Sequence, residues 1–178
     1  MRRYNAALRF QGGRVEICSV NRAVKTEAEL DVVAGELRLT LLNVNDLPRL
    51  WVQLEPLLER ACEFSGGDFT PDIVLAGTGL HDGVERLQIL ALAHGETIES
   101  IMVTCVSRAP SGKQSLECLL TAGHDIAAWL PFEPLMDEWA RSLDCTIVRI
   151  PRGRKGWLKA LSHWRIGGYV LEREIGVT

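Results

Sequence analysis

Residues 119–175 read LLTAGHDIAAWLPFEPLMDEWARSLDCTIVRIPRGRKGWLKALSHWRIGGYVLEREI, and this stretch decides the fold. A strand ends before the loop 122–125, apolar side chains at helical spacing predict a helix over 132–143, and a strand follows at 145–150. A final strand is expected at 169–175. A helix between two strands of one sheet predicts a right-handed crossover and a parallel strand pair.

The residues before this stretch predict further strands and two helices. Residues 36–43 (ELRLTLLN) alternate apolar and polar side chains, which indicates a strand. Asp46 is the expected N-cap of a helix over 47–61, which Pro56 should bend or split. Thr70 is the expected cap of a short second helix. An antiparallel meander is then expected from strands at 86–94, 97–108 and 115–121.

Composition and charge exclude several classes of protein. The chain has 178 residues, is 47% hydrophobic and carries a formal net charge of −3, which predicts a single globular domain and disfavours nucleic-acid binding by bulk charge. No apolar run reaches the length of a membrane span. Five scattered cysteines without CxxC spacing argue against a disulfide framework or a zinc site and fit a reducing compartment. The histidines form no metal-binding spacing either.

The first residues of the chain differ from the rest. Residues 6–10 and 14–20 alternate apolar and polar side chains around Gln11, Gly12 and Gly13, which is typical of a β-hairpin. We therefore divide the chain into an N-terminal arm or hairpin at residues 1–34 and a main domain at residues 35–178. The hairpin either caps the domain, adds an edge to its sheet or reaches toward a partner.

The order of these elements resembles that of the GNAT N-acetyltransferase fold, and the local sequence is similar to GNAT-like proteins of tailed bacteriophages. The resemblance spans residues 36–175. It rests on Trp51, on Gly66 and Gly67, on Gly123 and His124 with Trp129, on Trp139, Ala140 and Arg141 with Cys145, on GRKGW at 153–157, and on 169–175. It implies an α/β (mixed α+β) fold with a central mixed, mostly antiparallel sheet flanked by helices, preceded here by the N-terminal hairpin or arm.

The resemblance also implies where acetyl-CoA and catalytic groups would lie. The family binds the CoA pyrophosphate at the start of the helix after the meander, a position that Gly123, His124, Ile126 and Ala127 occupy here. The family pattern there is Arg or Gln, two residues, Gly, one residue, and Gly or Ala. In this chain its basic first residue and its second glycine are absent, and Asp125 adds an anion. The general base would be Glu99, with His94 and Glu117 as alternatives, and Tyr169 would be the acid.

Two functions from different classes follow from this resemblance. The incomplete phosphate loop favours a non-catalytic bacteriophage structural or assembly protein without a cofactor, placed near the head–tail junction or in the tail. Such a protein would occur in multiple copies in the virion or the host cytoplasm. It would contact other phage structural proteins through residues 1–34, without membrane or direct nucleic-acid binding. The alternative is an active acetyl-CoA-dependent N-acetyltransferase. A small-molecule binding module on the same fold also stays open.

Overall fold

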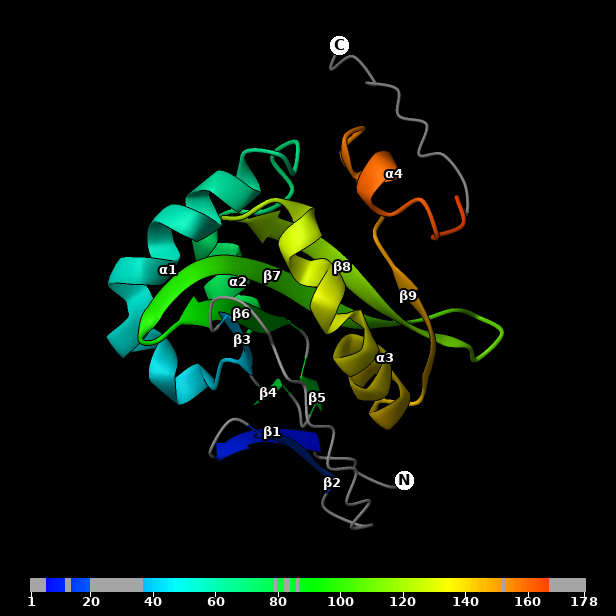
Figure 1. Cartoon of the computed structure of the whole chain (residues 1–178), viewed down its shortest axis with the longest axis horizontal. Helices are drawn as coiled ribbons and strands as arrows, with labels where there is room; N and C mark the ends of the chain where they lie inside the picture. Colours follow the sequence, from blue (N-terminus) through cyan, green and yellow to red (C-terminus); the bar gives the residue numbers. More distant parts are fainter. Residues whose placement is uncertain are drawn as a thin grey trace.

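The computed structural model describes residues 6–11, 14–19, 37–78, 80–81, 84–85, 87–151 and 153–166. Its centre is a five-stranded sheet in the spatial order β3 (Leu37–Leu41), β6 (Gln88–His94), β7 (Thr97–Arg108), β8 (Gln114–Ala122) and β9 (Cys145–Arg149) (Figure 1). The first four strands pair antiparallel, and β9 pairs parallel to β8. The expected meander and parallel strand pair are therefore confirmed.

Helices cover both faces of this sheet. On one face lie α1 (Leu47–Cys62) and α2 (Pro71–Gly77), and on the other lie the 3-10 helix η2 (Ile126–Phe132) and α3 (Glu133–Ser142). The helix α4 (Trp157–Ala160) follows β9 (Figure 1). This arrangement confirms the predicted mixed α+β class with a GNAT-like order of elements.

Each face of the sheet has its own apolar core because successive side chains of a strand point to opposite faces. In β6, Ile89 and Ala91 join the core under α1 and α2, whereas Leu90 and Leu92 join the core under η2 and α3. This explains why residues 88–92 form a continuous buried run instead of an alternating one. The second core also contains Met102, Trp129, Phe132, Met136 and Trp139.

The expected helix caps have different outcomes. Thr70 caps α2, since its side chain accepts a hydrogen bond from the Ile73 amide at 3.3 Å. The prediction for Asp46 was wrong: its side chain makes no cap hydrogen bond, and its backbone is already helical (φ −88°, ψ −18°) because a 3-10 turn, η1 (Val44–Asp46), precedes α1. Asn43 caps that turn instead. Pro56 lies inside α1 and does not split it.

The N-terminal hairpin is present as β1 (Ala6–Gln11) paired antiparallel with β2 (Arg14–Ser19), and β1 contacts β3. Two short strands that the sequence did not predict, β4 (Leu80–His81) and β5 (Val84–Glu85), form a second small hairpin. The expected final strand at 169–175 lies outside the described residues, and the division between residues 34 and 35 stays a prediction. Among the described helices, none is both long enough and apolar enough to cross a bilayer.

The four cysteines whose side chains the structure describes are all free thiols, as the scattered spacing predicted. Cys62, Cys118 and Cys145 are buried, and Cys105 is partly buried. Burial, and to a smaller extent the neighbouring Cys105 and Glu117, raise the pKa of the Cys118 thiol to about 12. Cys118 is therefore an unreactive core residue in the folded chain.

We expect Cys118 to make the fold sensitive to alkaline pH. Because its folded pKa is raised, the thiol favours the folded state fully below its ordinary value of 9.0, and this contribution is lost as the pH rises toward about 12. Urea unfolding measured across this range should show a steeper loss of stability for the natural chain than for Cys118→Ala. Equal slopes for the two proteins would contradict the assignment. Iodoacetamide should label Cys118 only in the unfolded chain.

Candidate functional site

A β-bulge in β7 aims Glu99 at two histidines. The pairing of β6 with β7 passes from Leu92 opposite Ser100 to Ala93 opposite Ile98, which leaves Glu99 as the extra residue. Bulges re-aim side chains in this way and are common beside active sites. The Glu99 carboxylate lies 2.5 Å from His124 Nε2 and 3.9 Å from His94 Nδ1. The shorter contact is a hydrogen bond, whereas the longer one is an ion pair only when His94 is protonated.

Gly123 allows the loop that carries His124 to cross β7 at backbone contact. Gly123 has φ +100°, and a Cβ atom there would lie 2.1 Å from the Glu99 carbonyl oxygen and 2.5 Å from Ser100 Cα. No L-residue with a side chain fits this position without moving the loop or the strand. The glycine is therefore required for packing, and its expected contact with a phosphate stays a prediction.

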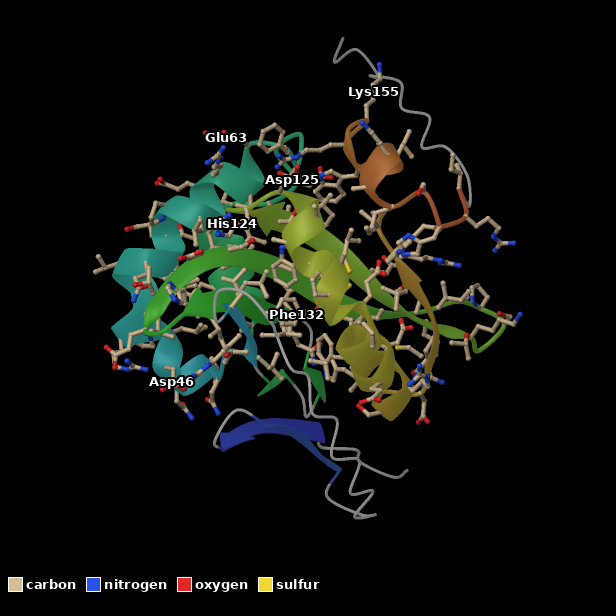
Figure 2. The ribbon with its side chains drawn as sticks, viewed as in Figure 1. Asp46, Glu63, His124, Asp125, Phe132 and Lys155 are labelled. Carbon is tan, nitrogen blue, oxygen red and sulfur yellow. The ribbon has the colours of Figure 1, made fainter. Side chains whose placement is uncertain are left out.

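A buried polar chain fixes this loop to the sheet. The Ser100 hydroxyl, which has no solvent exposure, donates to the Ala122 carbonyl at 2.8 Å and accepts from Trp129 Nε1 at 3.1 Å. The hydroxyl thus satisfies the indole N–H, the group that a buried tryptophan must pair. The contacts of Ser100 hold η2 and the end of β8 against β7. His124 (labelled in Figure 2) lies on the loop between them and is held beside Glu99 as a result.

Beyond Glu117, β8 has an open edge on the side of β9. The parallel pairing covers only residues 114–117 of β8, and no other described strand pairs with that side. A second bulge lies in the open part: the β7–β8 register passes from Thr104 opposite Cys118 to Val103 opposite Leu120, and Leu119 is the extra residue. We call residues 118–122 of β8 the open edge. Its backbone groups are available to an extended ligand.

A small groove lies along the open edge. It has a volume of about 30 Å³, which is room for one or two water molecules. It is lined by Ala61, Phe64, Ser65, Phe69, Leu119, Leu120, Thr121, Arg154 and Trp157. The Arg154 guanidinium donates to the Thr121 carbonyl at 3.4 Å and lies 3.7 Å from the centre of the Phe64 ring. The groove therefore combines apolar side chains with polar groups, and Arg154 is the one cation among the residues that line it.

The structure brings together only some of the residues that the sequence selected. Glu99, His94 and His124 lie together, although His124 was expected at a phosphate site and not beside a carboxylate. Glu117 lies apart from them, where it accepts from the Ser115 hydroxyl and pairs with Arg149 at 3.8 Å. Tyr169 lies outside the described residues.

The loop after β8, which the resemblance predicts to bind phosphate, is built differently from the family pattern. It leads into η2, a 3-10 helix, and α3 begins only at Glu133. Ile126 is buried in the core, so only its amide could reach a ligand, whereas Ala127 is exposed. Asp125 is exposed and its side chain makes no cap bond to the first amides of η2. Across the described side chains, no cluster of His, Cys, Asp and Glu could hold a metal ion.

Two features of the site could not be found from the sequence. The bulges at Glu99 and Leu119 depend on the register of neighbouring strands and leave no local signal. Ser100 and Arg154 acquire their roles through partners more than 20 residues away in the chain. The only available signal for the loop was the single glycine at 123, followed by a histidine.

Comparison with known proteins identifies the fold. No protein-family model and no curated protein matches the sequence. An aminoglycoside acetyltransferase from an uncultured soil metagenomic sample, in complex with trehalose, has a TM-score of 0.54 and 15% identity over 80% of this chain and 97% of its own. A probable acetyltransferase has a TM-score of 0.54 and 14% identity, with 79% and 99% covered. A ribosomal-protein-alanine N-acetyltransferase from Brucella melitensis biovar Abortus 2308 has a TM-score of 0.50 and 13% identity, with 80% and 98% covered.

These neighbours are acetyltransferases, and their likeness confirms the GNAT-like fold expected from the order of elements. At such identities the likeness concerns the fold alone. The bacteriophage origin inferred from the local sequence is not tested by these neighbours and stays a prediction.

Replacing Gly123 tests whether the loop depends on backbone contact with β7. Gly112, in the β7–β8 turn, is a matched control because it also has a positive φ (+83°) but has open space where a Cβ atom would lie. We expect Gly112→Ala to cost about 1 to 2 kcal/mol of unfolding free energy from backbone strain alone. Gly123→Ala adds the clash and should cost more than about 4 kcal/mol. Similar losses in urea unfolding would show that the loop is not packed as described.

Proposed function

We propose that this chain is an acetyl-CoA-dependent N-acyltransferase of the GNAT type. The observation that carries the proposal is the open edge of β8 beside a small groove, in a fold shared with acetyltransferases. The arm of coenzyme A is an extended chain with secondary amide groups, and an unpaired strand edge recognises such chains by main-chain hydrogen bonds. Residues 118–122 of β8 would hold that arm, and acetyl-CoA would supply the activated acyl group.

The Glu99–His124 pair supplies the proton acceptor that such a reaction requires. An amine must lose a proton to attack an acyl group, and a carboxylate or imidazole within hydrogen-bond reach, or one water away, can take it. Glu99 is about one-third exposed and His124 about half exposed, at 30% and 47%, so both are accessible to an acceptor. Tyr169 remains the predicted proton donor to the leaving thiolate.

The acceptor amine is a second part of this proposal. The solved neighbours include an aminoglycoside acetyltransferase and a ribosomal-protein-alanine N-acetyltransferase. Aminoglycosides and peptides with an N-terminal alanine are therefore the first amines to assay. Glu99 and Asp125 place carboxylates at the loop, which favours a cationic acceptor.

Acetyl-CoA should stabilise the chain in a thermal-shift measurement, because a ligand at a hundredfold excess over its Kd adds about 2.7 kcal/mol. Release of free CoA thiol should be measurable with at least one amine of the panel. Glu99→Gln keeps the size of the side chain and removes the base, so it should lower kcat by about 10²- to 10⁴-fold while leaving the thermal shift in place.

Glu117→Gln is the matched control for Glu99→Gln. It makes the same chemical change on a neighbouring strand, at a carboxylate that pairs with Arg149 and not with His124. We expect it to keep near-natural kcat. If the two variants lose activity equally, Glu99 has no special role. If acetyl-CoA causes no thermal shift at millimolar concentration, the enzyme proposal fails as a whole.

A second candidate is the non-catalytic assembly protein, and the loop after β8 favours it. Its one glycine is used for packing against β7, and Glu99 and Asp125 place negative charge where a diphosphate would sit. Under this proposal the chain binds no cofactor and contacts phage structural proteins, in the virion or the host cytoplasm. Residues 1–34 would supply the main contact, in multiple copies.

Deletion of residues 1–34 tests the second candidate directly. We expect the full chain to sediment as an oligomer or to co-purify with particles, and the shortened chain to sediment as a folded monomer that no longer does so. Circular dichroism of the shortened chain would confirm that residues 35–178 still fold. Unchanged assembly after the deletion would remove the arm from this role.

A further inference from the structure

Arg154, in the segment after β9, forms a side-chain hydrogen bond back to the open edge of β8. After Arg149 the chain leaves β8, yet the Arg154 guanidinium returns to donate to the Thr121 carbonyl at 3.4 Å. The same group lies 3.7 Å from the Phe64 ring centre and 5.8 Å from that of Trp157. Arg154 thereby links β8, the turn after α1, and α4.

The hydrogen bond shows which way the Thr121 backbone points. Since Thr121 pairs with β7 on its other side, a carbonyl that accepts from Arg154 faces the open edge. This is the group that an extended, amide-bearing chain would need as its acceptor. Arg154 therefore already occupies a main-chain position that a ligand would use.

We propose that Arg154 closes the groove in the resting chain and competes with the arm of acyl-CoA for the open edge. This inference rests on the proposed acyltransferase function and concerns the regulation of that site. The cofactor's arm must displace the guanidinium from Thr121, and displacement frees the segment 153–157 from Phe64. Binding of acyl-CoA is then coupled to movement of this segment, as expected where a site is closed in most of the molecules.

The contacts of Arg154 suit displacement and do not suit an anion site. Arg154 and Phe64 are both exposed, and exposed cation–π and hydrogen-bond contacts are individually weak. The groups around the guanidinium are a carbonyl oxygen and two aromatic faces, which all present negative electrostatic potential. A phosphate bound here would meet the Thr121 carbonyl as well as the arginine. A strand edge closed by a cation fits these contacts better.

Calorimetric titration of acetyl-CoA into Arg154→Ala tests the proposal. Removing the competing guanidinium should lower the Kd by about threefold to tenfold relative to the natural chain. Lys155→Ala is the matched control, because it removes the same charge from the next residue, whose exposed side chain points away from the sheet (Figure 2). Its Kd should stay equal to that of the natural chain or rise slightly.

The outcomes separate this inference from the function on which it rests. Weaker binding by Arg154→Ala than by Lys155→Ala would overturn the inference and make Arg154 a ligand of the cofactor. Unchanged binding would overturn it as well. No binding by any of the three proteins would overturn the acyltransferase proposal itself.

Hydrogen exchange without cofactor gives a second readout that does not depend on the proposed function. Peptides that cover residues 118–122 should exchange faster in Arg154→Ala than in the natural chain, because the closed edge opens. The same peptides in Lys155→Ala should exchange at the natural rate. Equal exchange in Arg154→Ala and the natural chain would show that the arginine does not hold the edge, which would overturn the inference.

Discussion

The close approach of the loop after β8 to β7 is the contact on which the rest of the site depends. Gly123 brings bare backbone against Glu99 and Ser100, where a side chain has no room. The Ser100 hydroxyl then joins Ala122 to Trp129, which carries the loop into the core under α3. Because these contacts fix both ends of the loop, the His124 side chain lies against the Glu99 carboxylate. Glu99 and Ser100 of β7 and Gly123 of the loop after β8 therefore determine both the packing of this loop and the geometry of the candidate site.

The open edge, which is the second part of the candidate site, results from a difference in length between β8 and β9. β8 has nine residues and β9 has five, and β9 pairs only with the first part of β8. Any longer pairing would cover the edge, and an uncovered edge is a liability in a globular protein because its backbone groups invite unintended pairing. Arg154 covers it by a side-chain contact instead of a strand. The Arg154 side chain can move away from the edge and back without unfolding the sheet, so a ligand could still bind to the edge.

The sequence predicts the elements of this fold well and their contacts poorly, for physical reasons. The continuous apolar run at 89–93 and the helical spacing before Cys145 are local patterns, and both gave the correct element. Asp46 was misassigned because a 3-10 turn at Val44–Asp46 moves the cap to Asn43, and such turns have almost no sequence signal. Glu99 was selected by its place on a central strand, but its bulge and its partner His124 depend on register and on a loop crossing.

The charge of the loop distinguishes the two ligands that an acyltransferase must bind. Glu99 and Asp125 are both carboxylates: Glu99 pairs with His124 on the loop, and Asp125 directly precedes η2, where the resemblance places the diphosphate. A diphosphate is repelled there, whereas an amine, which is a cation at neutral pH until it gives up its proton, is attracted. The same carboxylate that attracts the amine can then take the proton. In the function we propose, the acyl carrier would in turn be held by the uncharged contacts that the backbone of residues 118–122 offers once Arg154 has moved. On that proposal the loop would recognise the acceptor and the open edge would recognise the donor.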